Sequence, residues 1–192
     1  MKWYYIILII ILVGTVIYYY LYPLYLQYTL RKIAVDLFTS LNNNNVEYWA
    51  DFGTLLGIVR ENDIIWWDTD VDVVVVDTPE LHEKMGLVGK DLVKKGYTME
   101  KMDWRAYRVY HLGLYADLYI NSINHNKNVY IGATGKDGNS NISVDYIGKC
   151  AWIIWKKYNI PVRVPEKIHE TLSWRYGEDY MTPKRHFKGR DS

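Results

Sequence analysis

Three aspartates stand at alternate positions directly before a run of four valines, in the segment DTDVDVVVV (68–76). The valines are β-branched and make the segment apolar on both faces, so we expect a strand inside a sheet rather than at its edge. Extended backbone places Asp70 and Asp72 on one side, with Cα atoms about 7 Å apart. Carboxylates this close repel one another, so the fold needs a compensating charge.

A divalent cation is the compensating charge that suits this pattern. Carboxylate oxygens are hard ligands of the kind that Mg²⁺ and Mn²⁺ prefer. An isolated D-x-D is short and common, and is often only a solvated turn acid. Here the valines fix the acids at the mouth of a buried strand, where open α/β sheets bind ligands. We therefore expect Asp70 and Asp72 to be metal ligands, with Asp68 joining them if the strand begins early.

A second group of residues upstream of the acids suggests a phosphate site. Gly53 and Thr54 precede a segment that we expect to form one short helix ending at Arg60. Backbone N–H groups and a hydroxyl at a helix N-terminus can hold phosphate, and an arginine can bind a diphosphate bidentately. Taken singly, these residues are an ordinary turn and a surface ion pair. Together with the acids, they predict a phosphate site facing a metal site.

The beginning of the chain is a candidate membrane anchor. No charged residue lies between Lys2 and Arg31. Trp3–Tyr22 would be about 30 Å long as a helix, which matches the hydrocarbon core of a bilayer. Aromatic clusters at both ends are typical of the interfacial belts of a spanning helix. A cleaved signal peptide would have a shorter apolar stretch that ends in a small-residue cleavage site. We interpret residues 1–23 as a single-pass anchor.

Charge and cysteine content limit the partners and the topology. Arg31 and Lys32 weakly favour a cytosolic domain under the positive-inside rule, whereas the sequon Asn141-Ile142-Ser143 favours the lumen, so the side of the membrane stays open. A net charge of +1 gives no strong field for nucleic acid. The single cysteine, Cys150, excludes an intramolecular disulfide and a multi-cysteine zinc site.

The remaining pattern alternates between helical and extended segments. We expect helices over 24–41, over 78–95 with Thr78 as cap and Pro79 in first position, and over 165–176. We expect strands over 46–52, 71–76, 97–102, 104–112 and 115–120. A loop or hairpin is expected over 121–141. This alternation predicts one mixed α/β domain with helices packed against a central sheet.

Two segments resemble the LicD-type phosphotransferase family, which includes fukutin and fukutin-related protein. Members carry G-T-x-L-G-x-x-R, an apolar stretch and then W-D-x-D-x-D on a strand, although a proline often stands where Trp66 stands here. A closing segment, 160–183, is similar to the family's last helix and its Y-G-x-x-Y/W segment. The positions that match the first motif are Gly53, Thr54, Leu56, Gly57, Arg60, Trp67, Asp68, Asp70 and Asp72.

The resemblance covers about residues 45 to 183 and implies a nucleotidyltransferase-like fold. It also implies a third acid on a strand beside the acidic pair. Asp117 is the best candidate, because an unpaired acid among apolar residues would be costly without a metal or substrate partner. Asp103 is the alternative. The implied organisation is an anchor over 1–23, a LicD-like catalytic domain over 24–183 and a basic tail over 184–192.

What the family does implies a reaction and roles for the site. Its members transfer a phosphorylated alcohol, such as phosphocholine or ribitol phosphate, from a CDP-activated donor to a carbohydrate hydroxyl. The roles implied are catalysis by Asp70, Asp72 and Asp117, metal binding by Asp70, Asp72 and Asp68, and donor-phosphate binding by Gly53, Thr54 and Arg60. Asp117 would either complete the metal site or take the acceptor proton.

Three other functions stay open. A nucleotide-sugar glycosyltransferase could use Asp70-Val71-Asp72 as its metal motif, although the segment between the anchor and Asp51 is short for the nucleotide-binding part of such an enzyme. A membrane-tethered binding module with a vestigial site is expected to lack one of the acids, and all of them are present. A nucleotidyltransferase acting on a small molecule would share the fold.

Overall fold

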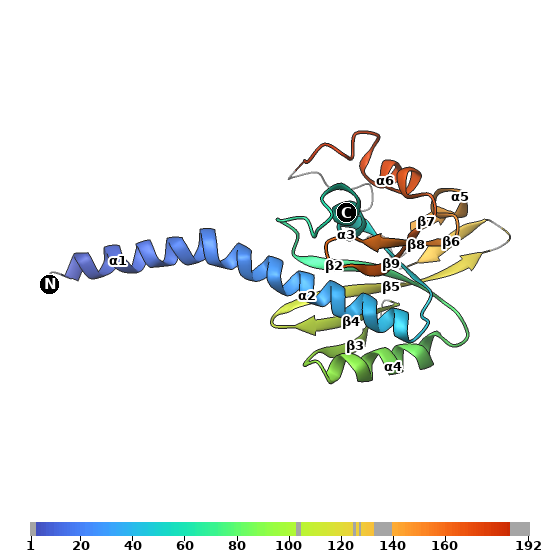
Figure 1. Cartoon of the computed structure of the whole chain (residues 1–192), viewed down its shortest axis with the longest axis horizontal. Helices are drawn as coiled ribbons and strands as arrows, with labels where there is room; N and C mark the ends of the chain where they lie inside the picture. Colours follow the sequence, from blue (N-terminus) through green and yellow to red (C-terminus); the bar gives the residue numbers. More distant parts are fainter. Residues whose placement is uncertain (1–2, 103–104, 125, 127, 133–139, 185–192) are drawn as a thin grey trace.

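The computed structural model describes residues 3–102, 105–124, 126, 128–132 and 140–184 (Figure 1). Its helices are α1 (Trp3–Val16), the π-helix η1 (Ile17–Leu21), α2 (Tyr22–Asn43), α3 (Phe52–Arg60), α4 (Leu81–Val93), α5 (Val144–Ile147) and α6 (Ile168–Tyr176). Its strands are β1 (Tyr48–Ala50), β2 (Asp70–Val76), β3 (Thr98–Met102), β4 (Ala106–His111), β5 (Leu114–Asn124), β6 (Val129–Gly132), β7 (Ser140–Ser143), β8 (Cys150–Trp155) and β9 (Ile160–Pro165).

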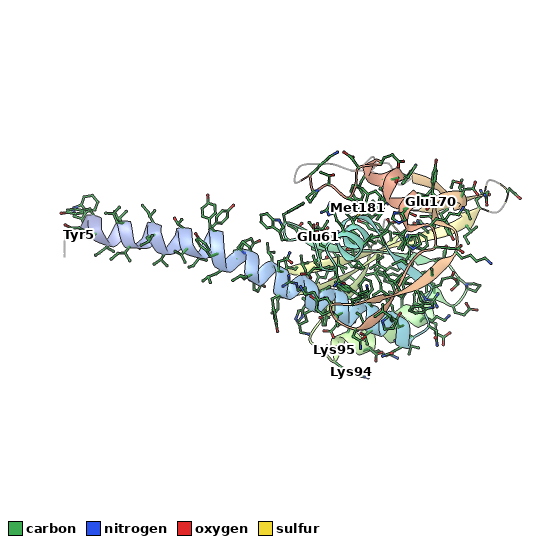
Figure 2. All side chains as sticks on the ribbon, turned by 45° about the horizontal axis from the view of Figure 1, so that its top comes forward. Tyr5, Glu61, Lys94, Lys95, Glu170 and Met181 are labelled. Carbon is green, nitrogen blue, oxygen red and sulfur yellow. The ribbon has the colours of Figure 1, made fainter. Side chains whose placement is uncertain are left out.

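One long helical segment, Trp3–Asn43, passes through α1, η1 and α2 and links the apolar beginning of the chain to the domain (Figure 1). Within the described ranges it is the one helix long and apolar enough to cross a membrane. α1 and η1 contribute no buried residue, and their side chains project on all sides of the helix in Figure 2. Burial begins at Leu26 in α2. The same helix therefore supplies both the apolar span and part of the domain core.

The domain is built on a seven-stranded mixed sheet with the strand order β1-β2-β5-β4-β3, in which β6 pairs with β5 and β7 with β6. β2 lies between antiparallel β1 and parallel β5, so the valine strand is an interior strand, as its composition predicts. β8 and β9 form a separate two-stranded sheet. α2 contacts α4 and the strands β2, β5 and β9, and α3 contacts β2 and α6.

The two faces of β2 have different surroundings. Val73 and Val75 belong to the main core, together with the buried residues of α2. Val74 belongs to a smaller cluster on the other face. Because side chains alternate along a strand, Asp70 and Asp72 lie on the same face as Val74, away from α2.

Several predicted boundaries are wrong. α4 begins at Leu81, because the backbone N–H of Leu81 donates to the Thr78 carbonyl and makes 78–81 a turn before the helix. α6 begins at Ile168, because Pro165 still pairs with Cys150 in β9. The β8–β9 hairpin was not predicted. The predicted loop or hairpin contains the end of β5, β6 and part of β7.

Some of the predictions fall outside the described residues. These are the alternative third acid Asp103, part of the 121–141 segment and the basic tail after Lys184.

Candidate active site

The three aspartates of the motif gather at the start of β2. Asp70 and Asp72 are the first and third residues of the strand, and Asp68 lies in the turn before it. Asp72 is paired in register with Asp117 of parallel β5. This is the amino end of both strands, so the rule that open sheets bind ligands at the carboxyl ends of their strands does not account for the site. The amino end of α3, which begins at Phe52, lies beside the start of β2, where the backbone N–H of Asp72 donates to Thr54.

Burial and mutual repulsion raise the pKa values of all three carboxyls. Burial, followed by the charge of Asp70, raises the pKa of Asp68 to about 7. Burial and the charge of Asp117 raise the pKa of Asp70. Burial, and then the charges of Asp70 and Asp68, hold the pKa of Asp72 well above its usual range. Such a cluster is stabilised by binding either protons or a cation.

The chemistry of the cluster fits a divalent cation. Its three half-buried carboxyls offer the hard oxygen atoms that Mg²⁺ and Mn²⁺ prefer. Gly53 makes room for one of them, because a Cβ at this position would lie 2.4 Å from Oδ2 of Asp68. Within the part of the chain that the structure describes, no group of three or more His, Cys, Asp or Glu side chains is arranged so that it could hold a metal ion. The three carboxyls are therefore not arranged as a ready-made coordination shell, and only Asp68 among them lines the cavity described below.

Thr54 joins helix α3 to the acidic strand. The backbone N–H of Asp72 donates to Oγ1 of Thr54 at 2.9 Å, and the Thr54 side chain is buried. Tyr119 on β5 donates from its hydroxyl to Oδ1 of Asp72 at 3.3 Å. Burial, and then the charge of Asp72, raise the pKa of Tyr119, which keeps this hydroxyl a donor. Thr54 and Tyr119 thus fix the position of Asp72 from two elements.

Asp117 has an arginine as its partner. Nε and Nη2 of Arg108 on β4 donate to Oδ1 and Oδ2 of Asp117 at 2.6 and 2.8 Å. The two residues are directly paired across the antiparallel β4–β5 ladder, and Asp117 is 4% exposed. The hydrogen bonds to Asp117 raise the pKa of Arg108. Arg108 therefore supplies the positive partner of Asp117, where the sequence predicts a metal or a substrate.

A buried ion pair fixes the amino end of α3. Oδ1 of Asp51 accepts a hydrogen bond from the backbone N–H of Phe52 at 2.7 Å and so caps the helix. Nε and Nη2 of Arg175 on α6 donate to the two Asp51 oxygens at 2.7 and 2.6 Å. The guanidinium also lies 3.7 Å from the centre of the Phe52 ring. α6 is therefore joined to the first turn of α3, which contains Gly53.

A cavity of about 130 Å³ lies beside Asp68 and brings together Gly53, Arg60 and Asp68. Arg60 is held there by an ion pair with Glu61 at 2.7 Å and by donation to the Tyr180 carbonyl at 3.2 Å. The other lining residues are Leu56, Ile65, Trp67, Tyr176, Asp179, Tyr180, Thr182 and Lys184. The cavity therefore combines aromatic walls with the basic groups of Arg60 and Lys184 beside the carboxyl of Asp68.

The family model described as "LicD/FKTN/FKRP, nucleotidyltransferase domain" matches residues 45–183, which include the acidic strand, α6 and all the lining residues of the cavity except Lys184. The chain belongs to this family. Membership confirms the predicted nucleotidyltransferase-like fold, and the observed mixed sheet confirms the α/β class. It also supports transferase activity for the LicD domain.

Relatives with curated sequences are uncharacterised and longer. Protein RP689 of Rickettsia prowazekii (strain Madrid E) is 35% identical over 81 residues, which are 42% of this chain and 29% of that protein. Protein RT0683 of Rickettsia typhi (strain ATCC VR-144 / Wilmington) is 39% identical over 54 residues, which are 28% of this chain and 18% of that protein. The matched segments span less than a third of each relative.

Solved structures give more distant matches. The solution structure of the antibiotic-resistance factor ANT(2'')-Ia has a TM-score of 0.47 and 14% identity, covering 82% of this chain and 76% of that one. The STING-associated CdnE c-di-GMP synthase of Capnocytophaga granulosa has a TM-score of 0.38 and 15% identity, covering 81% and 49%.

Sequence reasoning missed two arginines of the LicD domain. Neither Arg108 nor Arg175 is among the site residues that the sequence predicts. The register of the β4–β5 hairpin, with its turn at Leu112-Gly113, would have placed Arg108 opposite Asp117. The cap position of Asp51, directly before the helix, signalled that this acid is structural.

Proposed function

We propose that this LicD-family chain is a membrane-anchored, metal-dependent phosphotransferase. It moves a phosphorylated alcohol, such as phosphocholine or ribitol phosphate, from a CDP-activated donor to a glycan hydroxyl. The observation that carries the proposal is the cluster of Asp68, Asp70 and Asp72, whose pKa values are all raised by burial and by neighbouring acids, next to the amino end of α3. A cation with a phosphate ligand would offset this repulsion.

In the proposed site, Asp70 and Asp72 hold Mg²⁺ or Mn²⁺, with Asp68 beside them. When bound, the cation would neutralise negative charge on the donor diphosphate and on the departing CMP. Tyr119 and Thr54 keep Asp72 in place through the hydrogen bonds described above. Their contribution is positional, because a metal ligand must be held within a fraction of an ångström.

The donor phosphates bind at the amino end of α3, where Gly53 leaves the backbone open to close approach. The side chain of Thr54 is buried and its Oγ1 accepts the Asp72 N–H, so Thr54 supports the phosphate site through its position in the first turn of α3. Arg60 lines the cavity. Its guanidinium binds the donor phosphate in place of the Glu61 carboxylate, with which it forms an ion pair in the structure. Asp117 completes the metal site or accepts the proton of the acceptor hydroxyl, with Arg108 setting its orientation.

The transfer step has a defined balance. The acceptor oxygen forms a bond to the distal phosphorus of the CDP-activated donor, and the bond from that phosphorus to the bridging oxygen breaks. CMP leaves with the bridging oxygen, and the acceptor proton passes to a carboxylate and then to solvent.

The apolar segment 1–23 anchors the enzyme in the membrane. Its helix is exposed on every side and continues without a break into α2. The partners proposed are the CDP-activated donor, a carbohydrate acceptor and the bilayer, with no role for nucleic acid.

A donor screen tests the proposed reaction. The full chain, purified in detergent, is incubated with CDP-choline, CDP-ribitol, CDP-glycerol and UDP-sugars in the presence of Mg²⁺ or Mn²⁺, and CMP and UDP release are followed. We expect CMP release that is lost in Asp70→Asn and in Asp72→Asn and kept in Glu83→Gln, a matched change at an exposed acid on α4. Release of UDP alone would identify a glycosyltransferase, and retained activity in either Asn variant would remove the mechanism.

A further inference from the structure

Two loops of the domain are attached to α2 immediately beyond the apolar span. The hydroxyl of Tyr25 donates to the carbonyl of Leu112, in the turn between β4 and β5. Nε2 of Gln27 donates to the carbonyl of Ile65 at 3.0 Å, in the loop between α3 and β2. Tyr25 and Gln27 follow Tyr22 by three and five residues. At 1.5 Å per residue these attachments lie about 5 and 8 Å beyond the end of the span.

Large apolar side chains are exposed at the two attachments. Leu112 is 58% exposed at the tip of its turn, and Trp66, next to Ile65, is 50% exposed. Leu24 and Tyr28 of α2, at the same level, are 67% and 65% exposed. We call these four residues the membrane-facing rim. The headgroup region extends about 5–8 Å beyond the hydrocarbon core on each side, so the rim lies at its depth. Aromatic residues are enriched in this region.

The acidic cluster lies close behind this rim. Trp66 is two residues before Asp68 in the chain. Leu112 is three residues before Tyr115, which pairs with Asp70, so about 10 Å of strand separates the tip of the turn from the acid. In Figure 1 the start of β2 and the β4–β5 turn are on the side of the domain from which α1 leaves. The acids are therefore within about 20 Å of the hydrocarbon core.

We propose that the rim seats the domain on the bilayer that α1 crosses, and that the acceptor is presented from this bilayer as a lipid-linked glycan. The inference rests on the anchor and the transfer reaction proposed above and adds the class of acceptor. An acceptor attached to the same membrane keeps its hydroxyl at the depth of the acids and gains effective concentration from sharing the surface. The continuity of the rim with the span of the same helix identifies the bilayer as its occupant.

A depth measurement tests the seating. The full chain carrying Cys150→Ser, which removes the only cysteine, is given a nitroxide label at Leu112→Cys or at Ile123→Cys and placed in nanodiscs of phosphatidylcholine and phosphatidylglycerol. Ile123 is also apolar and exposed, at 38%, but lies near the opposite end of β5. We expect the label at 112 to be more accessible to oxygen than to a water-soluble nickel chelate, and the label at 123 to show the reverse.

The possible outcomes distinguish failure of the seating from failure of the membrane anchor and of the proposed transfer reaction. If the chain inserts in the nanodiscs and both labels favour the nickel chelate, the seating is wrong while the anchor stands. If the chain does not insert, the anchor is wrong and this inference is wrong with it. Loss of CMP release with correct label depths would instead count against the proposed reaction.

The acceptor class is tested by transfer to a disaccharide linked to diacylglycerol, in the same nanodisc as the enzyme, and to the same disaccharide free in solution. We expect at least tenfold faster transfer to the lipid-linked form at equal total concentration. Leu112→Asp should reduce this preference at least fivefold, whereas Ile123→Asp should leave it within twofold. Equal rates with the two acceptors would overturn the proposal, as would a preference that Leu112→Asp leaves unchanged.

Discussion

Replacing Asp68 with asparagine is expected to stabilise the metal-free protein, and to do so more strongly as pH rises. The pKa of Asp68 is raised from 3.8 to about 7, first by burial and then by the charge of Asp70. Between these values the folded chain holds a proton that the unfolded chain has released. A raised pKa gives a contribution to stability that is complete below about pH 4 and is lost as pH rises through about 7. Asparagine, which does not ionise, avoids that loss.

The size of the effect follows from the pKa shift. A displacement of about 3 pH units corresponds to ~4 kcal/mol in the free energy of unfolding. Asp68 is half-buried and keeps some contact with solvent, so we take about half of this value, ~2 kcal/mol. For a chain of this size 1 kcal/mol shifts Tm by about 2–4 °C. Asp68→Asn should therefore raise Tm by about 4–8 °C at pH 8.5 and by much less at pH 4.5.

The assay is thermal unfolding of the full chain in detergent with EDTA, followed by circular dichroism at pH 4.5 and 8.5. Glu83→Gln, at an exposed acid of α4, is the control and should leave Tm unchanged at both pH values. A Tm increase for Asp68→Asn that is the same at both pH values, or no increase at pH 8.5, would refute the electrostatic reasoning.

Three further predictions concern the supports of the site and of the fold. Arg175→Met should lower the free energy of unfolding by about 3–5 kcal/mol in urea denaturation, because it leaves Asp51 buried without its partner, and the double change with Asp51→Asn should recover part of the loss; an additive double variant would contradict this. Burial alone would raise the pKa of Asp36, but hydrogen bonds from two lysines and a tyrosine lower it to about 2. Because this pKa is lowered, Asp36→Asn should cost about 1 kcal/mol at pH 7, after allowance for solvent screening, and much less near pH 2, where the wild-type contribution is being lost; equal costs in urea titrations at the two pH values would argue against the assignment. Gly53→Ala should weaken Mn²⁺ binding at least tenfold in calorimetric titrations, since the added Cβ would lie 2.4 Å from an Asp68 oxygen, and unchanged affinity would show that this carboxyl is not needed where it stands.

The acidic strand was predictable because its signals are local. The β-branched run after Asp70 and Asp72 fixes an interior strand, and an acid flanked by apolar residues marks Asp117 as unusual wherever the strand lies. The structure then places Asp72 and Asp117 in register on neighbouring strands. Family membership agrees with the fold class that these patterns predicted. The metal and phosphate roles of the site residues stay predictions.

The residues that hold the site in place were less predictable because their partners are distant. Asp51 and Arg175 are separated by 124 positions, and no local pattern pairs them. Arg108 finds Asp117 only through the register of a hairpin. The β8–β9 hairpin was missed because Lys156–Asn159 contains no glycine or proline, and its turn places Asn159 at a φ of +52°.

Titration with Mn²⁺, followed by electron paramagnetic resonance and calorimetry in buffers of different ionisation enthalpy, tests most directly whether a cation compensates the acidic cluster. With CDP-choline present, the full chain should bind Mn²⁺ and release protons at pH 6, because binding displaces protons from carboxyls whose pKa values are raised. Asp70→Asn and Asp72→Asn should remain folded and lose this binding. Mn²⁺ binding of undiminished affinity in both variants, or binding without proton release, would contradict the account.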